Sequence, residues 1–137
     1  MRKSILFLYI SFIFATINVF NSYENISSND NEVDLIALPN FEVVSNSEDS
    51  RRFKYGHKFD VNLGIYNSGT WKTSNEGTNV WRLAIESLNA YALKVQFNEI
   101  FLPENSELFI YNESRDMIYG PYSSDNIHAD SFSAPLI

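Results

Sequence analysis

Three stretches between Val80 and Tyr111 alternate apolar and polar side chains, and short polar breaks separate them. Side chains of a β-strand point to opposite faces in turn, so a period of two indicates strands with one buried face. The apolar positions of these strands form the predicted core: Trp81, Leu83, Ile85, Leu93, Val95, Phe97, Leu108 and Ile110. This pattern builds a hydrophobic core and contains no catalytic arrangement.

Further short strands are predicted on either side of this region. Residues 59–63 alternate in the same way, and Asn67-Ser68-Gly69 marks a turn. Residues 117–119 indicate another strand, which Gly120-Pro121 ends because proline cannot donate to a ladder. About six to eight short strands without an amphipathic helix predict an all-β fold, an antiparallel β-sandwich that resembles a jelly roll.

The first residues have the pattern of an export signal. Arg2 and Lys3 precede an apolar stretch from Ile5 to Phe14, which continues less regularly to Phe20. The stretch is shorter than the roughly 20 residues of a membrane span, so a signal peptide over residues 1–22 is predicted, with an uncleaved anchor as the alternative. The protein is then secreted or at the cell surface, without stable membrane insertion after leader removal.

The remainder divides into two predicted parts. Residues 23–52 are a polar linker and an extended lead-in that Pro39 interrupts, with an edge strand as the alternative for the lead-in. Residues 53–137 form the β-sandwich domain. Its apolar end, residues 135–137, stops inside an expected strand, whereas chain ends are usually polar and solvated. We therefore expect a domain that is truncated at its C-terminal end.

Composition excludes several classes of function. The chain contains no cysteine, so disulfides and thiolate metal sites are absent. Its formal net charge is -7 and no basic stripe offsets it, which disfavours nucleic-acid binding.

Catalytic and metal-binding groups are sparse. The two histidines, His57 and His128, are the available general bases, and no serine-nucleophile motif accompanies them, so no catalytic residue is predicted. Asp125 and Asp130 flank His128 and are weak calcium candidates, although a solvated turn explains the same residues better. No metal or other cofactor is therefore expected.

Trp71 is the residue that most favours ligand binding. It follows a turn, so its ring is less firmly assigned to the core than that of Trp81, and Tyr119 and Tyr122 are candidates to lie near it. An exposed aromatic group of this kind can stack on a sugar ring. Glycan binding is therefore kept as an alternative function.

A series of motifs spreads over residues 38–137. In chain order they are Leu38-Pro39, Glu48-Asp49, Gly69-Thr70-Trp71, Val80-Trp81-Arg82-Leu83, Leu102-Pro103 through Leu108-Phe109-Ile110-Tyr111, Gly120-Pro121-Tyr122 and Ser133-Ala134-Pro135-Leu136-Ile137. The series resembles the domain that precedes the catalytic domain in secreted, trypsin-like serine proteases of the lysyl endopeptidase type from bacteria.

The resemblance implies a non-catalytic N-terminal pro-region that assists the folding or latency of a downstream protease domain, its implied partner. The family's catalytic domain lies beyond the matched part, so this chain is expected to be a fragment without peptidase activity. The alternative is a stand-alone extracellular module that binds a glycan or a cell-surface partner. A domain of a secreted adhesin or metalloprotease remains a third interpretation, since fold does not determine function.

Overall fold

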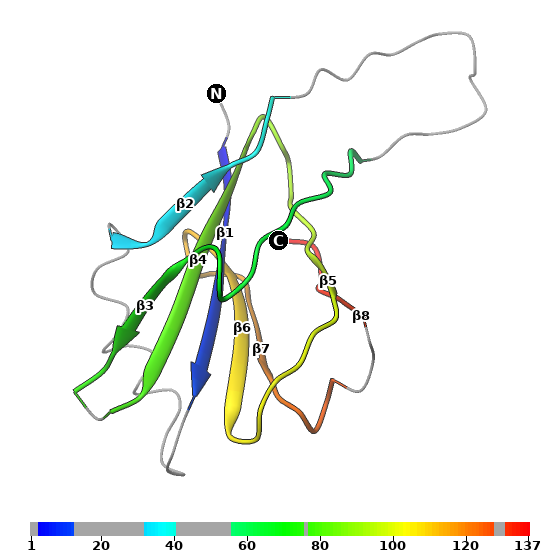
Figure 1. Ribbon diagram of the computed structural model, residues 1–137. Helices are drawn as coiled ribbons and strands as arrows, with labels where there is room; N and C mark the ends of the chain where they lie inside the picture. The colour runs from blue at the N-terminus through cyan, green and yellow to red at the C-terminus, as the bar shows by residue number, and fades with distance from the viewer. Residues whose placement is uncertain (1–2, 13–31, 41–55, 76, 128–130) are drawn as a thin grey trace, which may run out of the picture.

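The structure is a computed structural model that describes residues 3–12, 32–40, 56–75, 77–127 and 131–137. These residues contain eight β-strands and no α-helix, in one large sheet and one two-stranded sheet (Figure 1). The all-β prediction is confirmed. The strands are β1 (Lys3–Phe12), β2 (Asp34–Ala37), β3 (Thr70–Thr73), β4 (Asn79–Leu88), β5 (Gln96–Asn98), β6 (Ser106–Asn112), β7 (Ile118–Tyr122) and β8 (Ser131–Ser133).

The large sheet has the order β2-β4-β1-β6-β7, and β3 also pairs with β4. β2 runs parallel to β4 along Leu83–Glu86, whereas β3 runs antiparallel to it along Asn79–Arg82. The two short strands therefore share one edge of β4, end to end. The lead-in that was predicted as extended, with an edge strand as its alternative, supplies β2.

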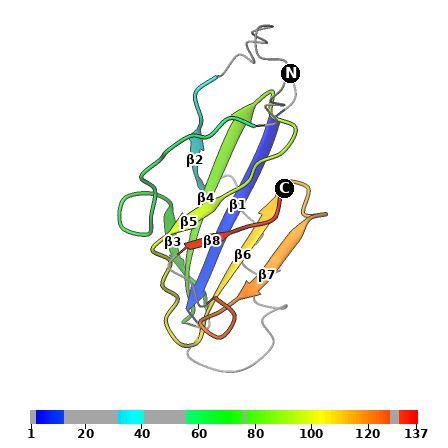
Figure 2. The same cartoon turned by 90° about the vertical axis from the view of Figure 1, so that its right-hand side faces the viewer.

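β1 lies at the centre of the large sheet, between β4 and β6 (Figures 1 and 2). It is antiparallel to both, from Lys3 opposite Leu88 to Phe12 opposite Asn79 in β4. The sequence predicts this segment as the apolar part of a leader, and in the structure of the full chain it lies inside the sheet. Its cleavage as a leader stays a prediction. A central strand and a leader share an apolar run without a clear period, so composition alone does not separate them.

The hydrophobic core lies between the inner face of the large sheet and the segments that cross it. Of the eight residues predicted for the core, those of β4 and β6 are buried, whereas Leu93, Val95 and Phe97 are partly buried and pack against them. Leu8, Leu102, Ala134 and Ile137 complete the buried cluster.

The strands β5 and β8 form the second sheet, which lies in front of the large one in Figure 2. Backbone hydrogen bonds extend their pairing beyond the Gln96–Ser133 end: Leu93 and Ile137 exchange two bonds of 2.7 and 2.9 Å, and the Ala134 amide donates to the Val95 carbonyl at 2.9 Å. The predicted strand of residues 91–97 is thus regular only at its end. Its burial alternates as expected from residue 92 to residue 97, whereas Tyr91, expected on the apolar face, is 85% exposed.

One predicted strand does not form, and the predicted end of another strand is wrong. Residues 59–63 form no strand, because the chain enters a loop in which the side chains of Asn67 and Ser68 accept hydrogen bonds from the Gly64 amide. Pro121 does not end a strand but lies inside β7. β7 is an edge strand with a register shift opposite β6, and an edge or a bulge tolerates a residue that lacks an amide hydrogen.

Candidate functional site

The described residues do not bring catalytic groups together. His57 is exposed, and its ring packs edge-on against Phe59 with 4.6 Å between the ring centroids. The neighbouring charges, Lys58 and Asp60, form an ion pair of 2.7 Å that is open to solvent. His128 lies outside the described residues.

Of the two predicted calcium ligands, Asp125 and Asp130, the structure describes only the first. Asp125 lies exposed in the turn of residues 123–127, where its amide donates to Ser123 Oγ at 3.3 Å. Asp130 lies outside the described part of the chain. Within that part, no three acidic, histidine or cysteine side chains gather as metal ligands would, and no helix is long and apolar enough to cross a membrane.

Both tryptophans hold the loop of residues 64–69. Trp81 Nε1 donates to the Ser68 carbonyl at 2.7 Å, and Trp71 Nε1 donates to the Ile65 carbonyl at 3.1 Å. The two residues are directly opposite each other in the β3–β4 pair, so their side chains share one face of the sheet. The loop therefore closes over this face at the β3 end of the sheet.

The two rings differ in exposure. Trp81 is 4% exposed and belongs to the core, whereas Trp71 is 45% exposed. Tyr66, in the loop of residues 64–69, is 97% exposed. The two exposed aromatic side chains of β3 and the loop before it, Trp71 and Tyr66, are called the aromatic surface below.

Tyr119 and Tyr122 do not extend this aromatic surface. They belong to β7, and β4, β1 and β6 separate β7 from β3, a distance of roughly 19 Å at the usual strand spacing. Tyr122 instead packs edge-on against Phe132 at 4.7 Å, and Tyr119 Oη donates to the Leu136 carbonyl at 3.4 Å. Burial raises the pKa of Tyr122, as does the nearby Tyr119.

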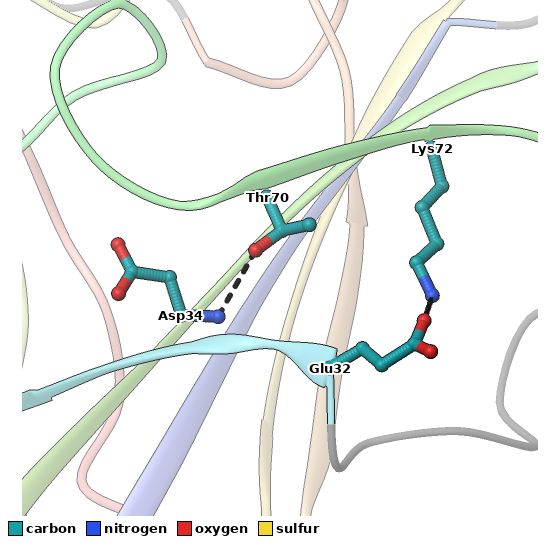
Figure 3. Close-up of polar contacts among 4 residues, drawn as sticks. All are labelled: Glu32, Asp34, Thr70 and Lys72. Atoms are coloured by element: carbon teal, nitrogen blue, oxygen red, sulfur yellow. Dashed lines mark hydrogen bonds and ion pairs between the residues drawn. The ribbon is translucent and has the colours of Figure 1, made fainter.

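A polar junction joins β2 to β3 where they meet along β4 (Figure 3). The Asp34 amide donates to Thr70 Oγ1 at 3.1 Å, and Asp34 Oδ2 accepts from the Gly69 amide at 2.9 Å. Lys72 Nζ forms an ion pair with Glu32, and its hydrogen bond and charge lower the pKa of that carboxyl, with a smaller contribution from Arg82. These contacts hold two short strands in one line, which is a structural role.

Glu107, on the outer face of β6, was not among the residues selected from the sequence. Its Oε2 atom is buried and has no hydrogen-bond partner, and loss of solvation raises the pKa of the carboxyl. The register places Glu107 directly opposite position 11 of β1. A glutamate at a polar position of an alternating strand normally points to solvent, so the pattern carried no signal for this burial.

The described site features are thus the aromatic surface of Trp71 and Tyr66 and the half-buried carboxylate of Glu107 beside the central strand. Comparisons with protein-family models, with curated proteins and with solved structures found no match.

Proposed function

We propose that this chain is the non-catalytic N-terminal β-sandwich of an exported, lysyl endopeptidase-like serine protease, with a folding or latency role for its protease domain. In this proposal the β5–β8 sheet and the large sheet are the two layers of the sandwich. The support comes from the ordered motifs and from the way their residues act in the structure.

The motif residues serve packing and backbone hydrogen bonding. The Gly69-Thr70-Trp71 motif meets the Trp81 motif at the loop of residues 64–69, where both indoles bind backbone carbonyls. In the Gly120-Pro121-Tyr122 motif, a Cβ on Gly120 would lie 2.6 Å from the carbonyl oxygen of Leu108, which belongs to the preceding motif. Motifs that contact one another favour a scaffold whose sequence is constrained by packing. This observation carries the proposal.

Refolding in trans tests the proposed role. A secreted bacterial lysyl endopeptidase is denatured and refolded with and without an equimolar amount of the full chain, and recovery of lysyl-peptide cleavage is measured. The proposal expects faster recovery or inhibition of the refolded enzyme, and no cleavage by the chain alone. The matched control is the Gly69→Ala chain, whose fold is weakened at the motif contact.

Two outcomes would reject this function. One is an unchanged recovery and an uninhibited enzyme at all ratios of the two proteins. The other comes from the source DNA, if the coding sequence beyond codon 137 contains no protease segment in any frame.

A glycan-binding module is the second candidate, because Trp71 is 45% exposed and Tyr66, in the loop that precedes β3, is 97% exposed. Soluble cello- and chito-oligosaccharides are titrated while tryptophan emission is recorded, with Trp71→Ala as the control. Binding that quenches the emission of the wild-type chain and disappears in the variant would favour this candidate. Unchanged emission with every sugar removes its support.

A further inference from the structure

β1 occupies the position between β4 and β6 in the large sheet, and this position is called the slot below. Both neighbouring strands form backbone hydrogen bonds with the strand in the slot. β1 forms register pairs with β4 over Lys3–Phe12 and with β6 over residues 6–12. Since β1 is antiparallel to both, β4 and β6 are parallel to each other, and each pairs with β1 and not with the other. Removal of β1 would expose two strand edges to each other across an empty place, a template for another strand.

The slot has a defined inner face. Leu8, the β1 residue whose side chain is described, is 3% exposed and lies in the core cluster. Its register partners are Leu83 in β4 and Ile110 in β6, both buried. Any strand in this slot therefore needs an apolar residue at the position of Leu8 and at positions two residues away on either side.

On the outer face of the slot, one side-chain atom lacks a hydrogen-bond partner. Glu107 Oε2 is buried without a hydrogen-bond partner, and its register partner is position 11, where β1 has serine. Directly opposed residues of an antiparallel pair have Cβ atoms about 4.5–5.5 Å apart, which a lysine or arginine side chain at position 11 would span. Burial of a carboxylate oxygen without a hydrogen-bond partner is unfavourable, so β1 leaves one buried atom of this half-buried side chain unsatisfied.

A long segment, residues 13–33, connects β1 to β2. A strand on a long connection can be exchanged between copies of a protein, as in domain swapping. The leader predicted over residues 1–22 includes all of β1, so processing there would remove it.

We propose that β4 and β6 form a strand-acceptor site that binds an extended segment of a partner polypeptide in place of β1. The segment runs antiparallel to both strands, carries apolar residues at the positions of Leu6, Leu8 and Ile10, and has a basic residue at the position of Ser11 that pairs with Glu107. A second copy of β1 supplies the apolar residues but not the basic one. This inference does not require the proposed protease, because its ligand is defined by the slot.

Peptide exchange into the full chain tests the site. The probes are three fluorescein-labelled peptides of residues 3–12: the native sequence, a Ser11→Lys peptide and a Leu8→Asp peptide. Fluorescence anisotropy is followed with the wild-type chain and with the Leu8→Ala chain, in which β1 is held less tightly. We expect the Ser11→Lys peptide to bind about tenfold more tightly than the native one, in keeping with a hydrogen bond to a charged group, and the Leu8→Asp peptide not to bind.

Glu107→Gln provides the matched control for the basic residue. It keeps the size of the side chain and removes its charge, so the preference for lysine should fall to about twofold or less. Equal binding of the lysine and serine peptides to the wild-type chain would overturn the proposed pairing. Absence of exchange in both chains, with hydrogen exchange still showing protected β4 and β6 amides, would overturn the acceptor site.

One further measurement distinguishes a second copy as the occupant. Size-exclusion chromatography of the full chain and of its Ser11→Lys variant reports exchange of β1 between copies. The proposal expects monomers for both chains. If the wild-type chain forms a dimer that the Leu8→Asp substitution abolishes, the occupant of the slot is a second copy of β1. That result would overturn the proposal that the occupant is a segment of another polypeptide.

Discussion

Gly69 and Trp81 are in direct contact, so that a Cβ on Gly69 would lie 2.4 Å from Nε1 and 2.5 Å from Cε2 of the indole. The same Cβ would lie 2.7 Å from the Arg82 carbonyl oxygen, and Gly69 has a φ of +79°. Glycine alone combines this backbone conformation with the missing side chain. The contact allows Trp81 Nε1 to reach the Ser68 carbonyl at 2.7 Å.

We predict that Gly69→Ala lowers the free energy of unfolding by about 2–5 kcal/mol, because a positive φ costs a residue with a Cβ about 1–2 kcal/mol and an overpacked contact costs about 1–3 kcal/mol. Urea denaturation measures the loss. Gly77→Ala is the control: Gly77 has a φ of +83°, but no atom lies within 4 Å of its added Cβ. It should lose about 1–2 kcal/mol. Equal losses in the two variants would show that the Trp81 contact contributes nothing.

Trp81→Ala should lower the free energy of unfolding by about 3–5 kcal/mol, since the ring is 4% exposed and fills the core. Trp71→Ala, at the directly opposed position, should lose less than about 2 kcal/mol because Trp71 is 45% exposed. Urea denaturation compares the two variants. A loss below about 1 kcal/mol for Trp81→Ala would mean that the apolar face of β4 is wrongly assigned.

Leu8→Ala tests the position of β1 in the sheet. The Leu8 side chain is 3% exposed within the core cluster, so its truncation should lower the free energy of unfolding by about 2–5 kcal/mol in the full chain. Leu35→Ala, at a residue that is 47% exposed, should lose less than about 1 kcal/mol. Full-length protein, verified by mass spectrometry, is unfolded in urea. Identical stability of Leu8→Ala and wild type would place residues 3–12 outside the fold.

The alternating pattern predicted that β4 is a strand, because period two identifies a strand without knowledge of its neighbours. The expectation of one buried face is wrong for this strand: Arg82, Ala84 and Glu86, on the face opposite Trp81, are buried as well. The pairing partners of a strand could not be predicted in this way, because nothing in the sequence of β4 indicates that β2 and β3 share one of its edges. The aromatic surface was therefore predicted at Trp71 but extended to tyrosines that lie at the opposite edge.

Composition and local pattern did not predict β1 as a strand. Its apolar run and the charges before it satisfy the pattern of a leader, and the long-range pairing with β4 and β6 leaves no local mark. Glu107 was missed for a related reason. Its burial depends on the strand opposite, and a glutamate within an alternating strand is normally solvated.

Glu107→Gln should change the pH dependence of stability. Burial raises the pKa of the Glu107 carboxyl in the folded chain above its unfolded value of about 4.3. Its contribution to stability is therefore fully present below that value and is lost as the pH rises through the folded pKa. Removing the group should make the variant gain stability relative to wild type between about pH 4 and pH 7.

The opposite sign is expected at Glu32, whose pKa is lowered by Lys72. Its contribution is present above the unfolded pKa of about 4.3 and is lost as the pH falls through the folded value. Relative to wild type, Glu32→Gln should thus be less stable at pH 7 and approach wild type below about pH 4. Urea denaturation of all three chains at half-unit steps from pH 3 to pH 7 measures both differences. If Glu107→Gln follows the course of Glu32→Gln, the Glu107 carboxylate is paired in solution, and the slot beside β6 has no need of a basic residue.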